Sequence, residues 1–170
     1  LFHQLIKVIQ PLDIELMISY IQKSQRAIHN IQGKDIILLL GETGAGKSTT
    51  IHFLAGSKFQ EIFVDGFDHL EPFQVSNFLD ELKVGASTQS VTTSIIAIQF
   101  PDGFIICDTP GFGDTKGTEI DISNGIGIIK ALCSARSIKP IMVLSEKNMD
   151  RLIGIRKINK TLSSMFKDIK

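Results

Sequence analysis

The sequence predicts a three-layer α/β fold, in which helices cover both faces of a mostly parallel sheet. Short apolar runs alternate along the chain with stretches that repeat apolar residues at helical spacing, which is the pattern of parallel α/β domains. A glycine-rich segment, 41–46, joins one apolar run to a helix-like stretch. Pro101-Asp102-Gly103 is strong turn chemistry between two further apolar runs, and it predicts one antiparallel hairpin.

The composition is that of one ordinary globular domain. The chain has 170 residues, of which 43% are hydrophobic and 21% charged. Lys+Arg and Asp+Glu both number 18, so no basic field would attract nucleic acid, and we expect no nucleic-acid partner. The apolar runs are too short for a transmembrane segment, and no signal peptide is visible. Cys107 and Cys133 form no disulfide framework, which favours a reducing, cytoplasmic compartment.

The first expected element is a helix over 13–30. Asp13 is its predicted N-cap and Gly33 its predicted stop. We expect this helix to pack on the domain through residues at helical spacing, namely Ile14, Met17, Ile18, Ile21 and Ile28. Residues 1–33 are therefore interpreted as an N-terminal helical extension.

The next elements surround the glycine-rich segment. Ile36–Leu40 is a short apolar run bounded by turn residues, which predicts a buried parallel strand. A helix is expected from Lys47 to about Ala55. Residues 57–88 mix phenylalanines with glycine, proline and acidic residues, and we expect them to be irregular, with a short helix near 74–83.

The second half repeats the alternation. Thr93–Phe100 and Phe104–Cys107 are the two strands of the expected hairpin. A helix is expected near 119–134, with an apolar face of Ile122, Ile126, Ile129 and Leu132. Pro140–Leu144 predicts another strand, and 150–169 an amphipathic helix with a basic outer face.

The glycine-rich segment carries the strongest functional signal. Gly-Glu-Thr-Gly-Ala-Gly-Lys-Ser matches the phosphate-loop (P-loop) pattern G-x-x-x-x-G-K-[ST] at every fixed position. Its glycines let several backbone N–H groups converge on a polyphosphate, and the following helix N-terminus favours anions. We expect Lys47 to reach the β- and γ-phosphates and to assist catalysis, and the Ser48 hydroxyl to hold Mg²⁺. The predicted nucleotide-binding residues are Gly41, Glu42, Thr43, Gly44, Ala45, Gly46, Lys47, Ser48 and Thr49.

A second motif begins where an apolar run ends, at Asp108-Thr109-Pro110-Gly111. A carboxylate at the end of a strand is placed to hold Mg²⁺, usually through one of its waters. Gly111 can offer its N–H to a γ-phosphate. Hydrolysis would remove that contact, so the loop over 111–118 is expected to act as a switch.

Together, Gly-Glu-Thr-Gly-Ala-Gly-Lys-Ser-Thr and Asp-Thr-Pro-Gly-Phe-Gly-Asp-Thr resemble the septin, immunity-associated and dynamin-related branches of the P-loop GTPases. The order of elements is similar from residue 36 to about 166. The resemblance implies a three-layer αβα P-loop fold, a G domain over 34–170, with an antiparallel hairpin between its second and third strands. It also implies GTP and GDP as ligands, Mg²⁺ as cofactor, and possible homo-oligomers through the G domain.

The resemblance further implies a threonine in the first switch that meets Mg²⁺ and the γ-phosphate. Ser87-Thr-Gln-Ser-Val-Thr-Thr-Ser94 precedes the hairpin where that residue belongs. The register favours Thr92 as this metal-binding and catalytic residue, with Thr93 and Thr88 as alternatives.

Two features depart from the family pattern. GTPases of this kind read guanine through an Asn/Thr-Lys-x-Asp segment, and no such tetrapeptide occurs in the chain. We expect it beyond Lys170, in a longer parent protein of which this chain is a fragment. The residue after Gly111 is Phe112, where Ras-like enzymes carry a glutamine that orients water. Phenylalanine cannot do so, and we expect slow GTP hydrolysis.

The sequence is therefore compatible with three candidate functions for this chain. The first is a GTP-hydrolysing switch, and the second is a septin-like assembly module whose bound nucleotide stabilises an interface with little turnover. The third is an ATP-binding P-loop protein such as a transporter cassette, which would need a Leu-Ser-Gly-Gly-Gln segment that the chain lacks. We expect no zinc site, and we expect His52 to be a packing or surface residue and not a base.

Overall fold

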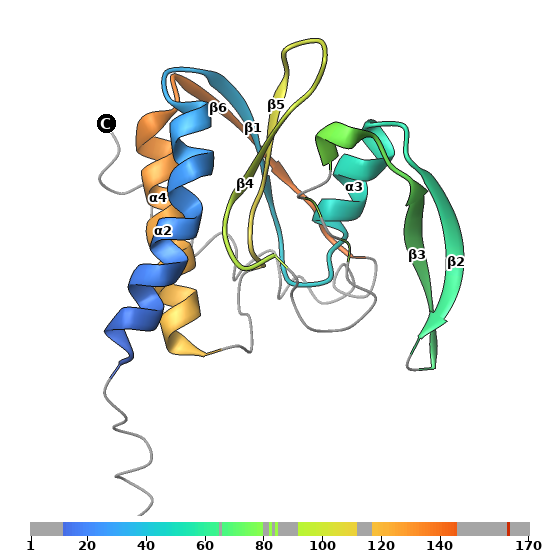
Figure 1. Ribbon diagram of the computed structural model, residues 1–170, viewed down its shortest axis with the longest axis horizontal. Coiled ribbons are helices and arrows are strands. Elements are labelled where there is room, and N and C mark those ends of the chain that lie inside the picture. Colours follow the sequence, from blue (N-terminus) through green and yellow to red (C-terminus); the bar gives the residue numbers. More distant parts are fainter. Residues whose placement is uncertain are drawn as a thin grey trace, which may run out of the picture.

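The protein is built around one four-stranded sheet with helices on both faces (Figure 1). A computed structural model describes residues 12–64, 66–79, 82, 84, 92–111, 117–145 and 163. The strands of the sheet lie in the order β4-β5-β1-β6, with bounds Ile96–Gln99, Ile105–Asp108, Asp35–Leu40 and Ser137–Met142. Helices α2 (Ile14–Ile31) and α4 (Thr118–Ser134) lie together on one face, and α3 (Lys47–Leu54) lies on the other.

The pairing of the strands is mostly parallel, as predicted. The central strand β1 runs parallel to β5, with Leu38 opposite Cys107, and parallel to β6 on its other side. Strand β4 is antiparallel to β5, and the two form the expected hairpin. Its turn ends at Gly103, whose φ of 92° is the left-handed conformation that such a three-residue connection requires. The α/β class, the hairpin and the helix ahead of the first strand are confirmed.

The core between the sheet and the α2–α4 layer is apolar, and the predicted helix faces supply only part of it, since Leu132 is buried and Ile28 packs against the core. Its buried members include Ala27 and Ile31 from α2, and Ile128, Ala131 and Leu132 from α4. The expected faces were wrong in part, because several of their members are exposed, namely Ile14, Ile18, Ile122 and Ile129.

The reason for this difference is close helix packing. Ser24 of α2 is buried at the contact, and a Cβ added at Gly127 of α4 would lie 3.0 Å from its Oγ. Ser123 of α4 donates its hydroxyl to the Met17 carbonyl of α2 at 3.2 Å. Small and polar residues therefore take part in the contact between the two helices, and apolar spacing does not reveal them.

The second core lies between the sheet and α3. It joins Ile51 of α3 to Leu39, Ile98 and Ile106 of the sheet, and to Leu79. Leu79 belongs to a short 3₁₀ helix, Asn77–Leu79, which lies within the predicted helical stretch 74–83.

Residues 57–88 are more regular than expected. Lys58–Val64 (β2) and Phe67–Gln74 (β3) pair antiparallel in a separate two-stranded sheet beside α3 (Figure 1). The expectation of an irregular segment was therefore wrong. Both faces of this ribbon are partly exposed, which hides the alternation of buried and exposed residues by which strands are found in a sequence.

Asp13 is the N-cap of α2, since its carboxylate accepts a hydrogen bond from the Leu16 N–H at 2.9 Å. The predicted helix over 150–169 lies outside the described residues, apart from residue 163. The division of the chain at residue 33 stays a prediction. Among the described residues, no helix is both long and apolar enough to cross a membrane.

His52 of α3 is buried, in agreement with a packing role. Its Nδ1 lies 3.2 Å from the Ser57 hydroxyl, and its Nε2 lies 3.0 Å from the Leu82 carbonyl oxygen. The ring therefore links the end of α3 to the segment that leads away from the 3₁₀ helix.

The two cysteines should differ sharply in reactivity. Cys107 is fully buried in β5, and burial, with a smaller contribution from the Asp108 charge, raises the pKa of its thiol from 9.0 to about 12. Cys133 is exposed. We expect a disulfide reagent at pH 8 to label Cys133 quickly and Cys107 only as the protein unfolds.

The same shift has a consequence for stability. Because the folded-state pKa of Cys107 lies above its unfolded value, the contribution of this thiol to the free energy of unfolding is fully present below pH 9 and is lost as the pH rises toward 12.

Equal labelling rates for both thiols in the native protein would contradict the buried placement of β5.

Candidate nucleotide-binding site

The candidate site lies where β1 and β5 end side by side. Because the two strands are parallel neighbours, the loop that follows β1 and the residues that follow β5 emerge at the same edge of the sheet. The first connection is the glycine-rich loop, 41–46, and the second begins at Asp108. The sheet therefore brings together two motifs that are about 60 residues apart in the sequence.

The glycine-rich loop has the backbone that its sequence requires. Gly44 and Gly46 adopt left-handed conformations, with φ of 76° and 91°. A side chain at either position would strain the turn. Gly41 is needed for another reason, since a Cβ there would overlap the carbonyl of Val143, which follows β6. Helix α3 starts at Lys47 directly after the loop, so its first N–H groups face the loop.

Lys47 lies inside the curl of this loop. Its side chain is only 6% exposed, and its Nζ donates to the carbonyl oxygens of Gly41 at 3.0 Å and Glu42 at 2.9 Å. The ammonium group therefore lies among the backbone groups that the loop sequence is expected to wrap around phosphates. Thr49 follows on the first turn of α3 and is half-buried.

The structure brings Ser48, Thr92 and Asp108 into one cluster. Asp108 Oδ2 accepts hydrogen bonds from the Ser48 hydroxyl at 2.6 Å and from the Thr92 hydroxyl at 3.1 Å. The two hydroxyl oxygens are themselves 3.5 Å apart. Of the three candidate threonines, Thr92 is the one placed against the carboxylate. Thr93 is its neighbour, and Thr88 lies outside the described residues.

The Asp108 carboxylate is an unusual group to find at this depth. It is fully buried, and that burial raises the pKa of the carboxyl, although the Ser48 hydrogen bond, the Lys47 charge, the Thr92 hydrogen bond and a backbone hydrogen bond from Thr109 act in the opposite direction. Its Oδ1 is buried and has no hydrogen-bond partner among the described residues. A buried acceptor without a partner costs about 1–3 kcal/mol, so this oxygen is a candidate ligand for a cation.

Gly111 lies directly against the glycine-rich loop. A Cβ at this position would overlap both the backbone and the hydroxyl of Thr43. The Thr43 hydroxyl is also buried, and it has no hydrogen-bond partner in the described part of the chain. The two motifs therefore touch at Gly111, and the lack of a side chain there allows the contact. Phe112 lies outside the described residues.

One structural contributor was missed by the sequence analysis. Thr109 is fully buried, and its hydroxyl donates to the Leu39 carbonyl of β1 at 2.6 Å. This bond fixes the start of the Asp108–Gly111 loop to the neighbouring strand. A threonine in a loop otherwise made of proline and glycine was the available signal, but only the fold reveals its partner.

The described residues hold no cluster of three or more His, Cys, Asp or Glu side chains that would suit a metal such as zinc. The available ligands at the site are oxygens instead, namely one carboxylate and two hydroxyls. Hard cations such as Mg²⁺ prefer such ligands.

The contact at Gly111 gives a direct test of the site geometry. We expect Gly111→Ala to destabilise the fold by about 1–3 kcal/mol, because the methyl group must displace Thr43. Gly125→Ala is the matched control, since a Cβ at this position in α4 meets nothing within 4 Å and removes a helix-destabilising glycine. Urea unfolding should show the control to be neutral or up to about 1 kcal/mol more stable. Equal stabilities for the two variants would contradict the contact.

Comparison with known proteins agrees with this geometry. A family model described as RsgA GTPase matches residues 2–117, which is most of the chain. The small ribosomal subunit biogenesis GTPase RsgA of Malacoplasma penetrans (strain HF-2) is 31% identical over 105 residues. That alignment covers 61% of this chain and 31% of the relative, so the chain spans less than a third of that protein.

These matches refine the expected family. They support the general P-loop GTPase class, but they do not support the septin, immunity-associated or dynamin-related branches that the two motifs suggested. The glycine-rich loop and Asp108–Gly111 both fall within the matched residues. The chain belongs to the RsgA GTPase family.

Proposed function

We propose that this chain binds GTP together with Mg²⁺ and hydrolyses the β–γ phosphoanhydride slowly, as a nucleotide-dependent switch. The observation that carries the proposal is the buried cluster of Asp108, Ser48 and Thr92 beside the Lys47 loop. Membership of a GTPase family and the GTPase named as a relative support GTP over ATP as the ligand.

The cluster fits a magnesium ion. Asp108 Oδ1 is buried without a partner, and the hydroxyls of Ser48 and Thr92 both point at the same carboxylate. We propose that Ser48 and Thr92 hold the ion through their oxygens and that Asp108 holds it directly or through a water. When bound, the ion supplies positive charge that neutralises the phosphate oxygens.

Residues of the chain itself bind the phosphates, stabilise the developing charge and respond to loss of the γ-phosphate. The backbone N–H groups of the loop and of the first turn of α3 bind the phosphates, since α3 begins directly after the loop and its first N–H groups have no partner within the helix. The Lys47 ammonium stabilises the negative charge that develops on the transferred phosphoryl group. The Gly111 N–H contacts the γ-phosphate, so its loop, fixed to β1 by Thr109, changes its contacts when that phosphate leaves.

The relative named above acts in small ribosomal subunit biogenesis. We propose that this chain serves the same process as its nucleotide-responsive part. Because its formal net charge is zero, the chain offers no overall basic field for RNA, and we propose that its contribution is nucleotide binding and not RNA recognition.

Lys47 provides the first test of nucleotide binding. We expect Lys47→Ala to weaken fluorescent GTP binding in Mg²⁺ by at least about thirtyfold, because charge-assisted hydrogen bonds to phosphate are lost. Lys58→Ala is the matched control, since Lys58 is exposed on β2, and it should bind like the wild type. Circular dichroism checks that both variants fold. Equal affinity for wild type and Lys47→Ala would contradict the proposal, and tighter binding of ATP than GTP would contradict its base preference.

Slow turnover is the second test. The residue after Gly111 is Phe112, an apolar side chain that cannot orient the attacking water. We expect single-turnover phosphate release slower than about 10⁻² s⁻¹ in dilute protein, within the range of GTPases that lack a catalytic partner.

The same measurement distinguishes the hydrolysing switch from a second candidate role, a nucleotide-dependent assembly module. The apolar Phe112 favours this second role. Release that accelerates with protein concentration supports a switch that is completed by assembly. Bound GTP that persists at every concentration favours the assembly module. Fast release from the dilute protein would contradict slow hydrolysis.

A further inference from the structure

The helix that begins at the glycine-rich loop carries a buried histidine on the same face as Ser48, the candidate magnesium ligand. Ser48 and His52 are four residues apart in α3, so their side chains lie one turn apart, about 6 Å along the helix axis. The Ser48 hydroxyl oxygen lies 3.5 Å from that of Thr92, and His52 contacts the Leu82 carbonyl. One face of α3 therefore meets the chain at Leu82 and again, about ten residues later, at Thr92.

The contacts of the histidine ring define what each of its nitrogens does. Nε2 lies 3.0 Å from the Leu82 carbonyl oxygen, and because a carbonyl only accepts, Nε2 carries the proton of this bond. Nδ1 of the neutral ring then accepts from the Ser57 hydroxyl at 3.2 Å. The Ser57 N–H also donates to the carbonyl of His52 at 3.0 Å. Ser57 therefore holds the ring in the orientation that points the Nε2 proton at Leu82.

The hydrogen bond to Leu82 fixes a direction as well as a position. The Leu82 side chain is already held, since it is buried in the core with Ile51 and Leu79. Its carbonyl belongs to the planar peptide unit that follows it, so holding the oxygen sets the direction in which the chain leaves the core. His52 therefore controls how the chain sets out toward Thr92.

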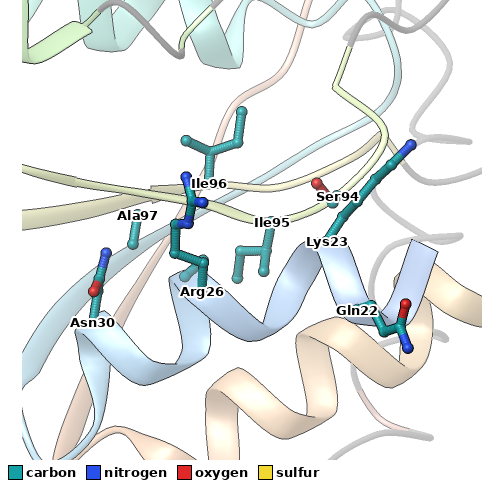
Figure 2. Close-up of a pocket in the computed structure, with 9 residues that line it drawn as sticks. Gln22, Lys23, Arg26, Asn30, Ser94, Ile95, Ile96 and Ala97 are labelled. Atoms are coloured by element: carbon teal, nitrogen blue, oxygen red, sulfur yellow. The ribbon is translucent and has the colours of Figure 1, made fainter. Parts of the chain in front are cut away.

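The chain is held again at Thr92 and just beyond it. The Thr92 hydroxyl donates to the Asp108 carboxylate at 3.1 Å, and Ile95 is buried in the core on the α2 side. Figure 2 shows residues 94–97 at a cavity beside β4, with the Ile95 side chain directed toward α2. Thr92 thus lies between two positions that the fold holds in place, Leu82 before it and Ile95 after it.

We propose that His52 is a positioning residue for Thr92 in the nucleotide site. Its bond to the Leu82 carbonyl sets the approach of the chain to Thr92, so that the Thr92 hydroxyl reaches the ion and the γ-phosphate. This role rests on the proposed function, in which Thr92 meets both groups. His52 then affects the binding of a triphosphate more than that of a diphosphate, because a diphosphate has no γ-phosphate for Thr92 to meet.

The test replaces His52 by two amides that each keep one of its contacts. Glutamine is long enough to place an amide N–H near the position of Nε2, whereas asparagine reaches only the position of Nδ1. We expect His52→Asn to lower the ratio of GTP-analogue affinity to GDP affinity roughly tenfold in Mg²⁺, since the bond to Leu82 is lost. His52→Gln should keep this ratio within about twofold of the wild type. Both affinities are measured on the whole chain, with fluorescent GDP and a fluorescent non-hydrolysable GTP analogue.

Two further variants separate positioning from a general loss of stability. Ser123→Ala is the matched control for a lost buried hydrogen bond, because Ser123 donates to the Met17 carbonyl on the other face of the sheet. It should lower the free energy of unfolding in urea without changing the affinity ratio. Thr92→Val should lower the ratio, and adding His52→Asn to it should lower the ratio no further, because both changes act through the same hydroxyl.

The outcomes distinguish the role of His52 from the proposed function itself. An unchanged ratio in His52→Asn, when Thr92→Val lowers it, would overturn the role of His52 and leave the proposed function standing. Equal losses in His52→Asn and His52→Gln, or losses that add in the double variant, would also overturn that role. A wild-type ratio in Thr92→Val, or a wild type that binds neither nucleotide, would overturn the proposed function and the role of His52 with it.

Discussion

The buried carboxylate of Asp108 is the group on which the rest of the site depends. It lies at the end of β5, and it is held by hydroxyls from two other segments, Ser48 at the start of α3 and Thr92 just before β4. Burial of a carboxylate is costly unless its oxygens are satisfied, and one of them has no partner among the described residues. The fold therefore maintains an acidic position that its own core would not favour, and this is the observation behind the proposed Mg²⁺ site.

The sheet fixes the geometry of this site through its register. Leu38 of β1 lies opposite Cys107 of β5, so the glycine-rich loop and Asp108 leave the sheet at the same level. The Thr109 hydroxyl then ties the second loop to β1, and Gly111 rests against Thr43 of the first. The two loops are therefore in direct contact at Gly111 and Thr43, and the proposed switch would act through this contact.

Much of this site could be predicted from the sequence because its requirements are local. Glycines at left-handed positions, a lysine at the start of a helix, and an aspartate at a strand end are each visible in a few residues. The turn at Gly103 was found for the same reason. The contacts of α2 and α4 were not found, because Ser24 and Gly127 meet across the fold and carry no apolar signal. The β2–β3 ribbon was missed because exposed Phe63 and Leu70 obscure its alternation. The Thr109 bond and the cavity beside β4 likewise depend on tertiary contacts.

The central claim is that Asp108 couples magnesium to nucleotide binding, and one comparison tests it most directly. GTP affinity is measured with Mg²⁺ and with a chelator for Asp108→Asn, which keeps the shape of the side chain but removes its charge. Asp102→Asn, in the exposed hairpin turn, is the matched control. The account predicts that Mg²⁺ tightens GTP binding in the wild type and the control but leaves the Asp108→Asn affinity unchanged. Full magnesium dependence in Asp108→Asn would contradict it.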